Sequence, residues 1–338
     1  MERGHRAVPS TLVLNDHHRR EVPRTTANLA AVSKVLIVGL PRSGTSWVGK
    51  ALGLAPGTAY VHEPDGDHDP FAYRARRGSF ITPVLRPGDD APELERLWQG
   101  AFAGGQRPTA FRSRLAWRLY RKSPVEQRWE AWSTGRETLS LKVISALAVP
   151  LEPVPTAQHV VAKSVRAEFC VEWICDRFAP AVVIVERHPL NALSSWSELG
   201  YGKDPRTLGP FGEIARERWG VRAPAVDAPL IERQAFVYGV GAAALREAVR
   251  ANPSWVVVSH EALCVDPQTS IRALLDRVGL GWGVATQRYL DESDRDGSGY
   301  LTQRKAREQP DRWQSRLDSE QVDTITSTLA EFPFDLMT

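Results

Sequence analysis

A nine-residue loop between a buried strand and a helix constrains the fold of this chain more than any other segment. Residues 35–40 form an unbroken apolar run of strand length, which is typical of a strand buried on both faces in a parallel sheet. The sequence Gly-Leu-Pro-Arg-Ser-Gly-Thr-Ser-Trp then leads into an expected helix over residues 48–54. Backbone N–H groups and the helix dipole favour a negative charge at such a junction. The loop therefore predicts an anion site at the end of the first strand.

The residues after the second glycine of this loop distinguish it from a kinase loop. Gly39 and Gly44 have the P-loop spacing Gly-x-x-x-x-Gly, but Thr45 and Ser46 follow where a kinase has lysine and a hydroxyl residue. A kinase uses that lysine to reach the β/γ-phosphates, with the hydroxyl on Mg²⁺. The cation here is Arg42, two residues before Gly44. The loop predicts anion binding without ordinary ATP chemistry.

Further apolar runs alternate with helical patterns along the chain. Strands are expected over residues 58–61, 159–162, 182–185 and 255–258, and helices over 167–178, 230–250, from Asp266 to Gly279, and from near Asp318. Alternation of this kind indicates a parallel sheet with right-handed crossovers. The predicted fold class is α/β, with a P-loop-like parallel sheet flanked by helices.

The domain organisation is predicted from the segments in which the strand and helix patterns are present and those in which they are absent. Residues 1–33 lack an apolar period and predict a flexible N-terminal arm, and residues 34–338 predict a single α/β domain. Residues 64–135 are rich in Arg, Trp, Pro and Gly and show no buried strand. This segment predicts a mostly helical, substrate-binding insertion after the second strand, with a packing subdomain as the alternative.

A second candidate anion site follows the strand at residues 182–185. Arg187 stands at the end of this strand, and Ser195 follows eight residues later in a helix started by Pro189. A tight turn plus about two helical turns would let both side chains reach one phosphate. The alternative is that Arg187 forms an ion pair with Glu186 or Asp204.

Together these two motifs resemble the sulfotransferase family that uses 3′-phosphoadenosine 5′-phosphosulfate (PAPS). Arginine at position 42 is similar to the protein-tyrosine branch and to many bacterial members. The resemblance implies that Thr45 and Ser46 bind the 5′-phosphate, that Trp47 lies near the adenine, and that Arg187 and Ser195 hold the 3′-phosphate. The loop residues that it assigns to the nucleotide are Pro41, Arg42, Ser43, Gly44, Thr45, Ser46 and Trp47.

A basic cluster near the C-terminus extends this resemblance. Arg304, Lys305 and Arg307 lie where family members return a basic loop to the 3′-phosphate, although the usual Arg-Lys-Gly form lacks its glycine here. Which of the three makes the contact is left open, and a solvated charged face is the alternative.

Sulfuryl transfer to a hydroxyl needs a base and a cation on the leaving phosphate. Arg42 is the candidate cation. Glu63 lies 21 residues beyond Arg42, a position similar to that of the catalytic glutamate in the protein-tyrosine branch. Glu63 is the first candidate base, His62 the second and His68 the third, and an ion-pair role for Glu63 is the alternative. No metal site is expected, because the acidic run at residues 65–69 lacks the calcium-loop pattern.

The predicted function is therefore transfer of a sulfuryl group from PAPS to an acceptor hydroxyl, leaving 3′-phosphoadenosine 5′-phosphate (PAP). The alternatives are a small-molecule P-loop kinase and a non-catalytic nucleotide-binding relative. The acceptor stays open among a small molecule, a lipid, a glycoside and a tyrosine residue, and so does the oligomeric state. A net charge of +3 does not call for a nucleic-acid partner, and no apolar run approaches the about 18 residues of a membrane span. With three cysteines and no signal-peptide core, we expect a cytoplasmic enzyme.

Overall fold

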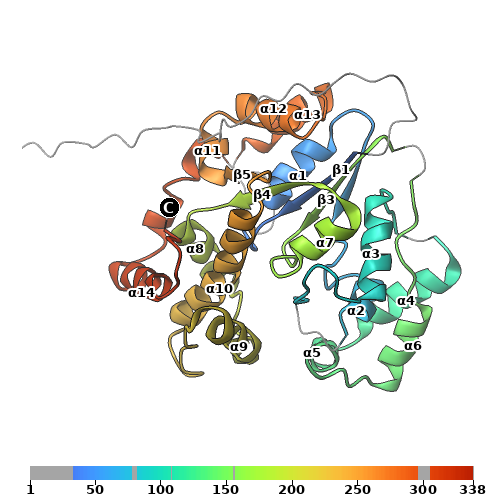
Figure 1. Cartoon of the computed structure of the whole chain (residues 1–338), viewed down its shortest axis with the longest axis horizontal. Coiled ribbons are helices and arrows are strands. Elements are labelled where there is room, and N and C mark those ends of the chain that lie inside the picture. Colours follow the sequence, from blue (N-terminus) through green and yellow to red (C-terminus); the bar gives the residue numbers. More distant parts are fainter. Residues whose placement is uncertain (1–32, 78–81, 108, 155–156, 296–304, 338) are drawn as a thin grey trace, which may run out of the picture. The chain divides into compact units, whose positions relative to one another are not determined.

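Five parallel strands form the central sheet of the computed structural model (Figure 1), which describes residues 33–77, 82–107, 109–154, 157–295 and 305–337. The sheet order is β2-β3-β1-β4-β5. The strands are β1 (Ser33–Val38), β2 (Thr58–His62), β3 (His159–Ser164), β4 (Ala181–Glu186) and β5 (Val256–Ser259). Each corresponds to one of the apolar runs. The predicted α/β class with a parallel sheet is confirmed.

Strand β1 lies at the centre of the sheet. The strands β2 and β3 are added on one side of it, and β4 and β5 on the other. Strand β1 pairs with β3 on one side, from Ser33↔His159 to Val38↔Ser164, and with β4 on the other. Strand β2 lies beyond β3, so the first crossover passes over one strand position. In open parallel sheets such a switch point opens a crevice at the carboxyl ends of the strands, where ligands bind.

The two faces of the sheet carry separate hydrophobic cores because successive strand residues point to opposite sides. Val35 and Ile37 pack against α1 (Thr45–Gly53), α12 (Pro267–Arg277) and α13 (Val284–Ser293). Leu36 and Val38 belong to the core on the other face, formed with α3 (Pro92–Phe102), α7 (Val171–Phe178), α8 (Pro189–Leu199) and α10 (Leu230–Ala251). Figure 1 shows these two helical layers on either side of the strands.

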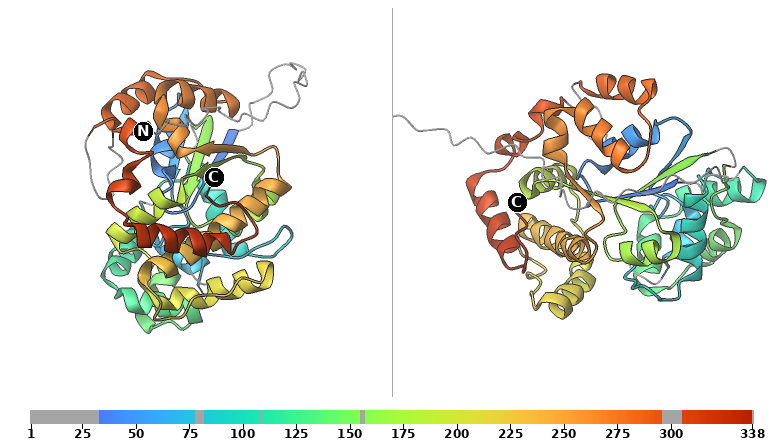
Figure 2. Two further views of the ribbon diagram at one scale, coloured as in Figure 1. Left: turned by 90° about the vertical axis from the view of Figure 1, so that its left-hand side faces the viewer. Right: turned by 45° about the horizontal axis from the view of Figure 1, so that its top comes forward.

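The segment between β2 and β3 is helical. It contains α2 (Pro70–Ala75), α3, α4 (Phe111–Lys122), α5 (Val125–Thr134) and α6 (Leu139–Leu147), gathered on one side of the sheet in both views of Figure 2. Helix α6 lies beyond residue 135, where the insertion was expected to end. Gly135, with φ +73°, ends α5, but Thr138 then caps a further helix by accepting from the N–H of Leu141. Whether the segment binds substrate stays a prediction.

The remaining helices complete the layer around the C-terminal half. They are α9 (Leu208–Trp219), α11 (His260–Val265) and α14 (Ser319–Ala330). Asp318 and Gln321 form the capping box expected at the start of α14. Within the described part of the chain, no helix has the length and hydropathy of a bilayer-spanning segment. The arm predicted for residues 1–33 lies outside the described residues except for Ser33, the first residue of β1.

Candidate functional site

The loop after β1 has an unusual backbone conformation. Arg42 has φ +69° and Gly44 has φ +91°, both in the left-handed region. Gly44 is the N-cap of α1, and no side chain of the described residues caps this end of the helix. An added Cβ at Gly44 would lie 2.1 Å from Cδ2 of His260, so the position requires glycine. A helix start without a side-chain cap suits an anion, and the anion site itself stays a prediction.

The second motif contacts this loop directly. Nε of Arg42 donates to Oγ of Ser195 at 3.0 Å, and Nη1 of Arg187 donates to the main-chain oxygen of Arg42 at 2.8 Å. Trp196 also donates from Nε1 to the main-chain oxygen of Pro41 at 2.8 Å. Two segments about 150 residues apart in sequence thus form one structural unit.

Arg187 makes neither of the ion pairs considered as its alternative role. Glu186 is engaged by Nε of Arg246 at 2.9 Å, and Asp204 is engaged by Arg206. The carboxylate nearest to Arg187 is instead that of Glu261, with Oε1 3.9 Å from Nε. Burial lowers the pKa of Arg187, and the charge of Glu261 opposes this effect.

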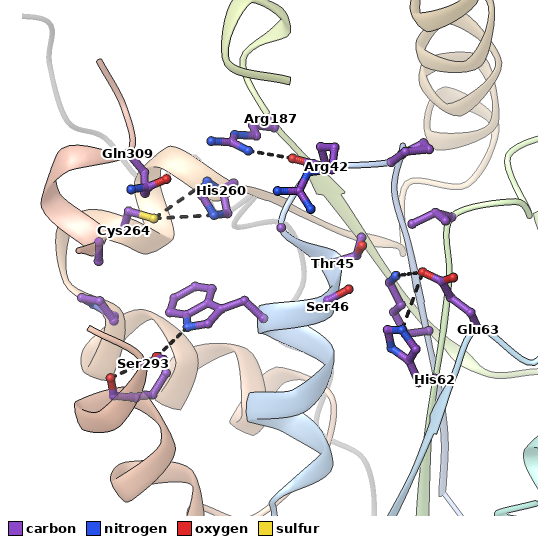
Figure 3. Close-up of a pocket in the computed structure, with 18 of the residues that line it drawn as sticks. Arg42, Thr45, Ser46, His62, Glu63, Arg187, His260, Cys264, Ser293 and Gln309 are labelled. Carbon is purple, nitrogen blue, oxygen red and sulfur yellow. Dashed lines mark hydrogen bonds and ion pairs between the residues drawn. The ribbon is translucent and has the colours of Figure 1, made fainter. Parts of the chain in front are cut away.

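A cavity of about 620 Å³ opens at the carboxyl edge of the sheet, as Figure 3 shows. Six of the seven loop residues assigned to the nucleotide line this cavity, and they are Pro41, Arg42, Gly44, Thr45, Ser46 and Trp47. His62, Glu63 and Arg187 line the same cavity. Ser43 instead lines a smaller cavity of about 240 Å³ together with Arg187. Ser195 is buried and accepts from Arg42, and its contact with a 3′-phosphate stays a prediction.

Glu63 is held against a buried lysine. Nζ of Lys163, on the neighbouring strand β3, donates to Oε1 of Glu63. The lysine side chain is only 1% exposed, whereas that of Glu63 is 22% exposed. Glu63 also has φ +45°, and its N–H donates to the main-chain oxygen of Lys163 at 2.8 Å. The contact fixes a carboxylate at the cavity wall in a strained backbone position.

The pKa shifts of Glu63 and His62 leave both candidate bases in the form that can accept a proton. Burial raises the pKa of Glu63, but the charge and hydrogen bond of Lys163 outweigh burial, so the pKa is lowered. Burial, followed by the charge of Lys163, lowers the pKa of His62. Nδ1 of His62 shares a hydrogen bond with the hydroxyl of Tyr60 at 3.0 Å. At neutral pH the carboxylate is ionised and the imidazole is neutral.

The third candidate base, His68, does not line the cavity. Its ring lies 6.3 Å from that of Trp117 in α4. The acidic residues around it serve the fold: Asp65 accepts from Oγ of Ser164 at 2.6 Å, and Asp69 caps α2. Among the residues that the structure describes, no three His, Cys, Asp or Glu side chains gather as a metal site.

The far end of the cavity contains the aromatic residue expected near the adenine. Nε1 of Trp47 donates to Oγ of Ser293 at 3.0 Å, and its ring meets His260 edge-on at 6.1 Å. Burial, with a further effect from the charge of Arg187, lowers the pKa of His260 to about 3, so this ring is neutral. Figure 3 shows His260 and Glu63 on opposite sides of the start of α1. The aromatic side chains and the Glu63 carboxylate therefore lie at different ends of the cavity.

The C-terminal basic cluster is only partly described. Ala306 and Gln309 line the cavity, so this segment does return to it. Nζ of Lys305 lies 3.6 Å from a carboxylate oxygen of Glu308, and its side chain is exposed. The backbone of Arg307 forms part of a short 3₁₀ helix (Ala306–Glu308), and Arg304 lies outside the described residues. Contact with a phosphate stays a prediction for all three.

Among the cavity residues that the sequence did not predict are two basic side chains. Lys163 and Arg166 line the cavity beside Glu63, and Nη2 of Arg166 lies 3.0 Å from a carboxylate oxygen of Asp67. A signal was present, because Lys163 directly follows the apolar run of β3. A charged residue at the carboxyl end of a buried strand is the same pattern that identified Arg187.

Comparison with known proteins finds similarity in structure. Similar solved structures include a sulfotransferase domain of the olefin synthase from Synechococcus PCC 7002, with 13% identity, coverage of 93% of this chain and 99% of that one, and a TM-score of 0.43. They also include a sulfotransferase domain of the curacin biosynthetic pathway, with 12% identity, coverage of 89% and 98%, and a TM-score of 0.46. A Mycobacterium tuberculosis H37Rv sulfotransferase has 15% identity, coverage of 89% and 77%, and a TM-score of 0.42. No protein-family model and no curated protein matches the chain. Its function is therefore inferred from its own residues.

Proposed function

We propose that this chain transfers a sulfuryl group from PAPS to the hydroxyl of an acceptor. The observation that carries the proposal is that the Arg42 loop, Arg187 and the Glu63–Lys163 pair all line one cavity. One side of the cavity is thus suited to a phosphorylated nucleotide, and the other to a proton-bearing acceptor.

The residues present fit a nucleotide with anionic groups at two positions. The uncapped first turn of α1, with the hydroxyls of Thr45 and Ser46 at the cavity wall, suits a 5′-phosphosulfate. The guanidinium of Arg187, anchored on the main-chain oxygen of Arg42, suits a 3′-phosphate. The ring of Trp47 provides an apolar surface for a base. PAPS, when bound, would supply the sulfuryl group and a phosphate leaving group.

The roles of the chain's own residues follow from their charges. The sulfur–oxygen bond to the acceptor forms as the bond to the leaving phosphate breaks, so negative charge grows on the phosphate oxygen, where Arg42 would stabilise it. The acceptor hydroxyl gives its proton to the carboxylate of Glu63. Lys163 keeps that carboxylate ionised, and Ser195 positions the guanidinium of Arg42.

The first experiment separates this function from that of a kinase. Titration calorimetry compares PAP with ATP and Mg²⁺, and a panel of acceptors is then incubated with PAPS while PAP release is followed. We expect PAP to bind and PAP release to depend on an acceptor. Binding of ATP with Mg²⁺ but not of PAP would favour a small-molecule kinase, and PAP binding without turnover would favour a non-catalytic relative.

Two substitutions then separate the leaving-group role from the base role. Arg42→Ala should slow transfer to every acceptor by about 10²–10³-fold. Glu63→Gln should slow transfer to an alcohol by about 10²–10⁴-fold, and this defect should shrink with an acidic phenol that ionises by itself. Glu198→Gln is the matched control, because that carboxylate is exposed and pairs with Arg316 away from the cavity. Wild-type rates with an alcohol in Glu63→Gln would contradict the base assignment, and His62 and His68 would be tested next.

A further inference from the structure

The outward side of α4 is a stripe of basic residues. Ser113, Ala116 and Tyr120 are buried, and they recur at the spacing of one helix face. The opposite side exposes the four basic residues Arg114, Arg118, Arg121 and Lys122. Helix α4 contains no acidic residue, and none of the described residues forms an ion pair with these four. The stripe therefore presents positive charge to the solvent.

Helix α6 packs beside α4 and exposes apolar residues instead (Figure 1). Leu139, Val143 and Ala146 recur at i, i+4 and i+7 on its outer side, while Leu141 and Ile144 face the core. Leu139 is 78% exposed, and Phe111 at the start of α4 is 75% exposed. Large apolar side chains so open to water indicate a surface that something covers.

The segment from α4 to α6 is far more positively charged than the rest of the chain. Residues 111–147 contain eight Arg or Lys and three Glu, a net charge of +5, whereas the entire chain carries only +3. The rest of the molecule is therefore slightly acidic, and the positive charge gathers on this one helical segment. A partner attracted by charge would meet this segment first.

We propose that the α4–α6 face (Phe111, Arg114, Arg118, Arg121, Lys122, Leu139 and Val143) binds the surface of an anionic lipid bilayer. Each Lys or Arg near an anionic bilayer strengthens binding by about fivefold, and apolar side chains beside them insert at the headgroup boundary. Protein interfaces are depleted of charged residues at their centre. Here exposed basic residues of α4 and exposed apolar residues of α6 lie on neighbouring helices, and a bilayer surface binds both kinds of side chain.

The inner side of the same helix contacts the wall of the candidate active site. The hydroxyl of Tyr120 donates to the main-chain oxygen of Asp67 at 2.8 Å, and Asp67 lines the cavity. Binding at the α4–α6 face would thus place a bilayer against the helix that supports this wall. The binding itself does not depend on sulfuryl transfer.

Sedimentation with lipid vesicles tests the proposal on the full chain. Vesicles of phosphatidylcholine mixed with phosphatidylglycerol should bind the chain, and vesicles of phosphatidylcholine alone should bind it weakly. The triple variant Arg118→Gln, Arg121→Gln, Lys122→Gln should bind the anionic vesicles about 100-fold more weakly. The matched control neutralises three exposed arginines elsewhere, Arg222→Gln, Arg277→Gln and Arg288→Gln, and should bind as the wild type does. Equal loss in both variants, or no binding of the wild type, would overturn the proposal.

A second variant distinguishes a bilayer from an acidic protein. Leu139→Ser with Val143→Ser should weaken vesicle binding by about tenfold, because less apolar surface inserts. It should leave binding to soluble polyglutamate unchanged, since the basic stripe is intact. Binding of the wild type to polyglutamate without binding to anionic vesicles would replace the bilayer with an acidic protein partner. Circular dichroism checks that each variant is folded.

Discussion

Glu63→Gln should destabilise the folded chain more than Lys163→Met does, although the two side chains form one ion pair. The reason is the difference in burial, since the lysine side chain is 1% exposed and that of Glu63 is 22% exposed. Glu63→Gln leaves a buried ammonium without its counter-charge. Lys163→Met leaves a carboxylate that still contacts water, and the methionine fills most of the lysine's space.

The magnitudes follow from what each substitution leaves behind. Removing one partner of a buried ion pair costs about 3–5 kcal/mol when the remaining charge stays buried. We expect about 3 kcal/mol for Glu63→Gln, at the low end because the carboxylate is partly exposed. For Lys163→Met we expect the free energy of unfolding to fall by about 1 kcal/mol, as it does when a solvent-exposed ion pair is broken. The double variant should be close to Lys163→Met alone, because no buried charge remains.

Urea unfolding followed by tryptophan fluorescence measures these differences. Glu198→Gln, which breaks an exposed pair, is the control and should change the free energy of unfolding by less than about 1 kcal/mol. A cost for Lys163→Met equal to or above that for Glu63→Gln would refute the reasoning, since burial of the lysine would then not be the dominant effect.

The pH dependence of the same variants provides a second readout. Burial lowers the pKa of Lys163 in the folded chain, and Glu63 opposes this effect. In Glu63→Gln only the weaker effect of Asp65 still opposes burial, so the pKa of Lys163 falls further. The loss of stability is then full below this folded pKa and shrinks as the pH rises through it. In the wild type the lowered pKa of Glu63 contributes stability above the unfolded carboxyl pKa, and this is lost as the pH falls through the folded value.

Three further outcomes test the nucleotide site. Gly44→Ala should weaken PAP binding and lower the melting temperature. A backbone φ of +91° costs alanine about 1–2 kcal/mol, and the new Cβ would clash with His260. Unchanged PAP binding in calorimetry would contradict this account of the loop. Arg187→Ala should weaken PAP binding by about 10–100-fold. The same variant should lose less affinity for adenosine 5′-phosphosulfate, which has no 3′-phosphate. Equal losses of affinity for the two ligands would show that Arg187 does not bind the 3′-phosphate. Activity should survive excess EDTA, whereas loss with rescue by Mg²⁺ would favour the kinase.

Much of the fold could be predicted from the sequence because the signals are local. A run such as residues 182–185 is apolar throughout because both faces of a central parallel strand are buried. The loop at Gly44 and the cap at Asp318 depend on a few adjacent residues, so their residue types were sufficient. Arg187 was identified in the same way, from its place at a strand end.

The partners of these residues were decided only by the tertiary structure. Glu63 meets Lys163 because β2 and β3 are neighbours, in a register that pairs His62 with Lys163. The sequence also allowed Arg187 to pair with Glu186, and Arg42 carried no sign of its bond to Ser195. Strand order and register bring together side chains a hundred or more residues apart, and neither leaves a local trace in the chain. The sequence by itself determined which segments are strands and helices and which loops are candidates for anion binding, and the sheet determined which of their side chains share one cavity.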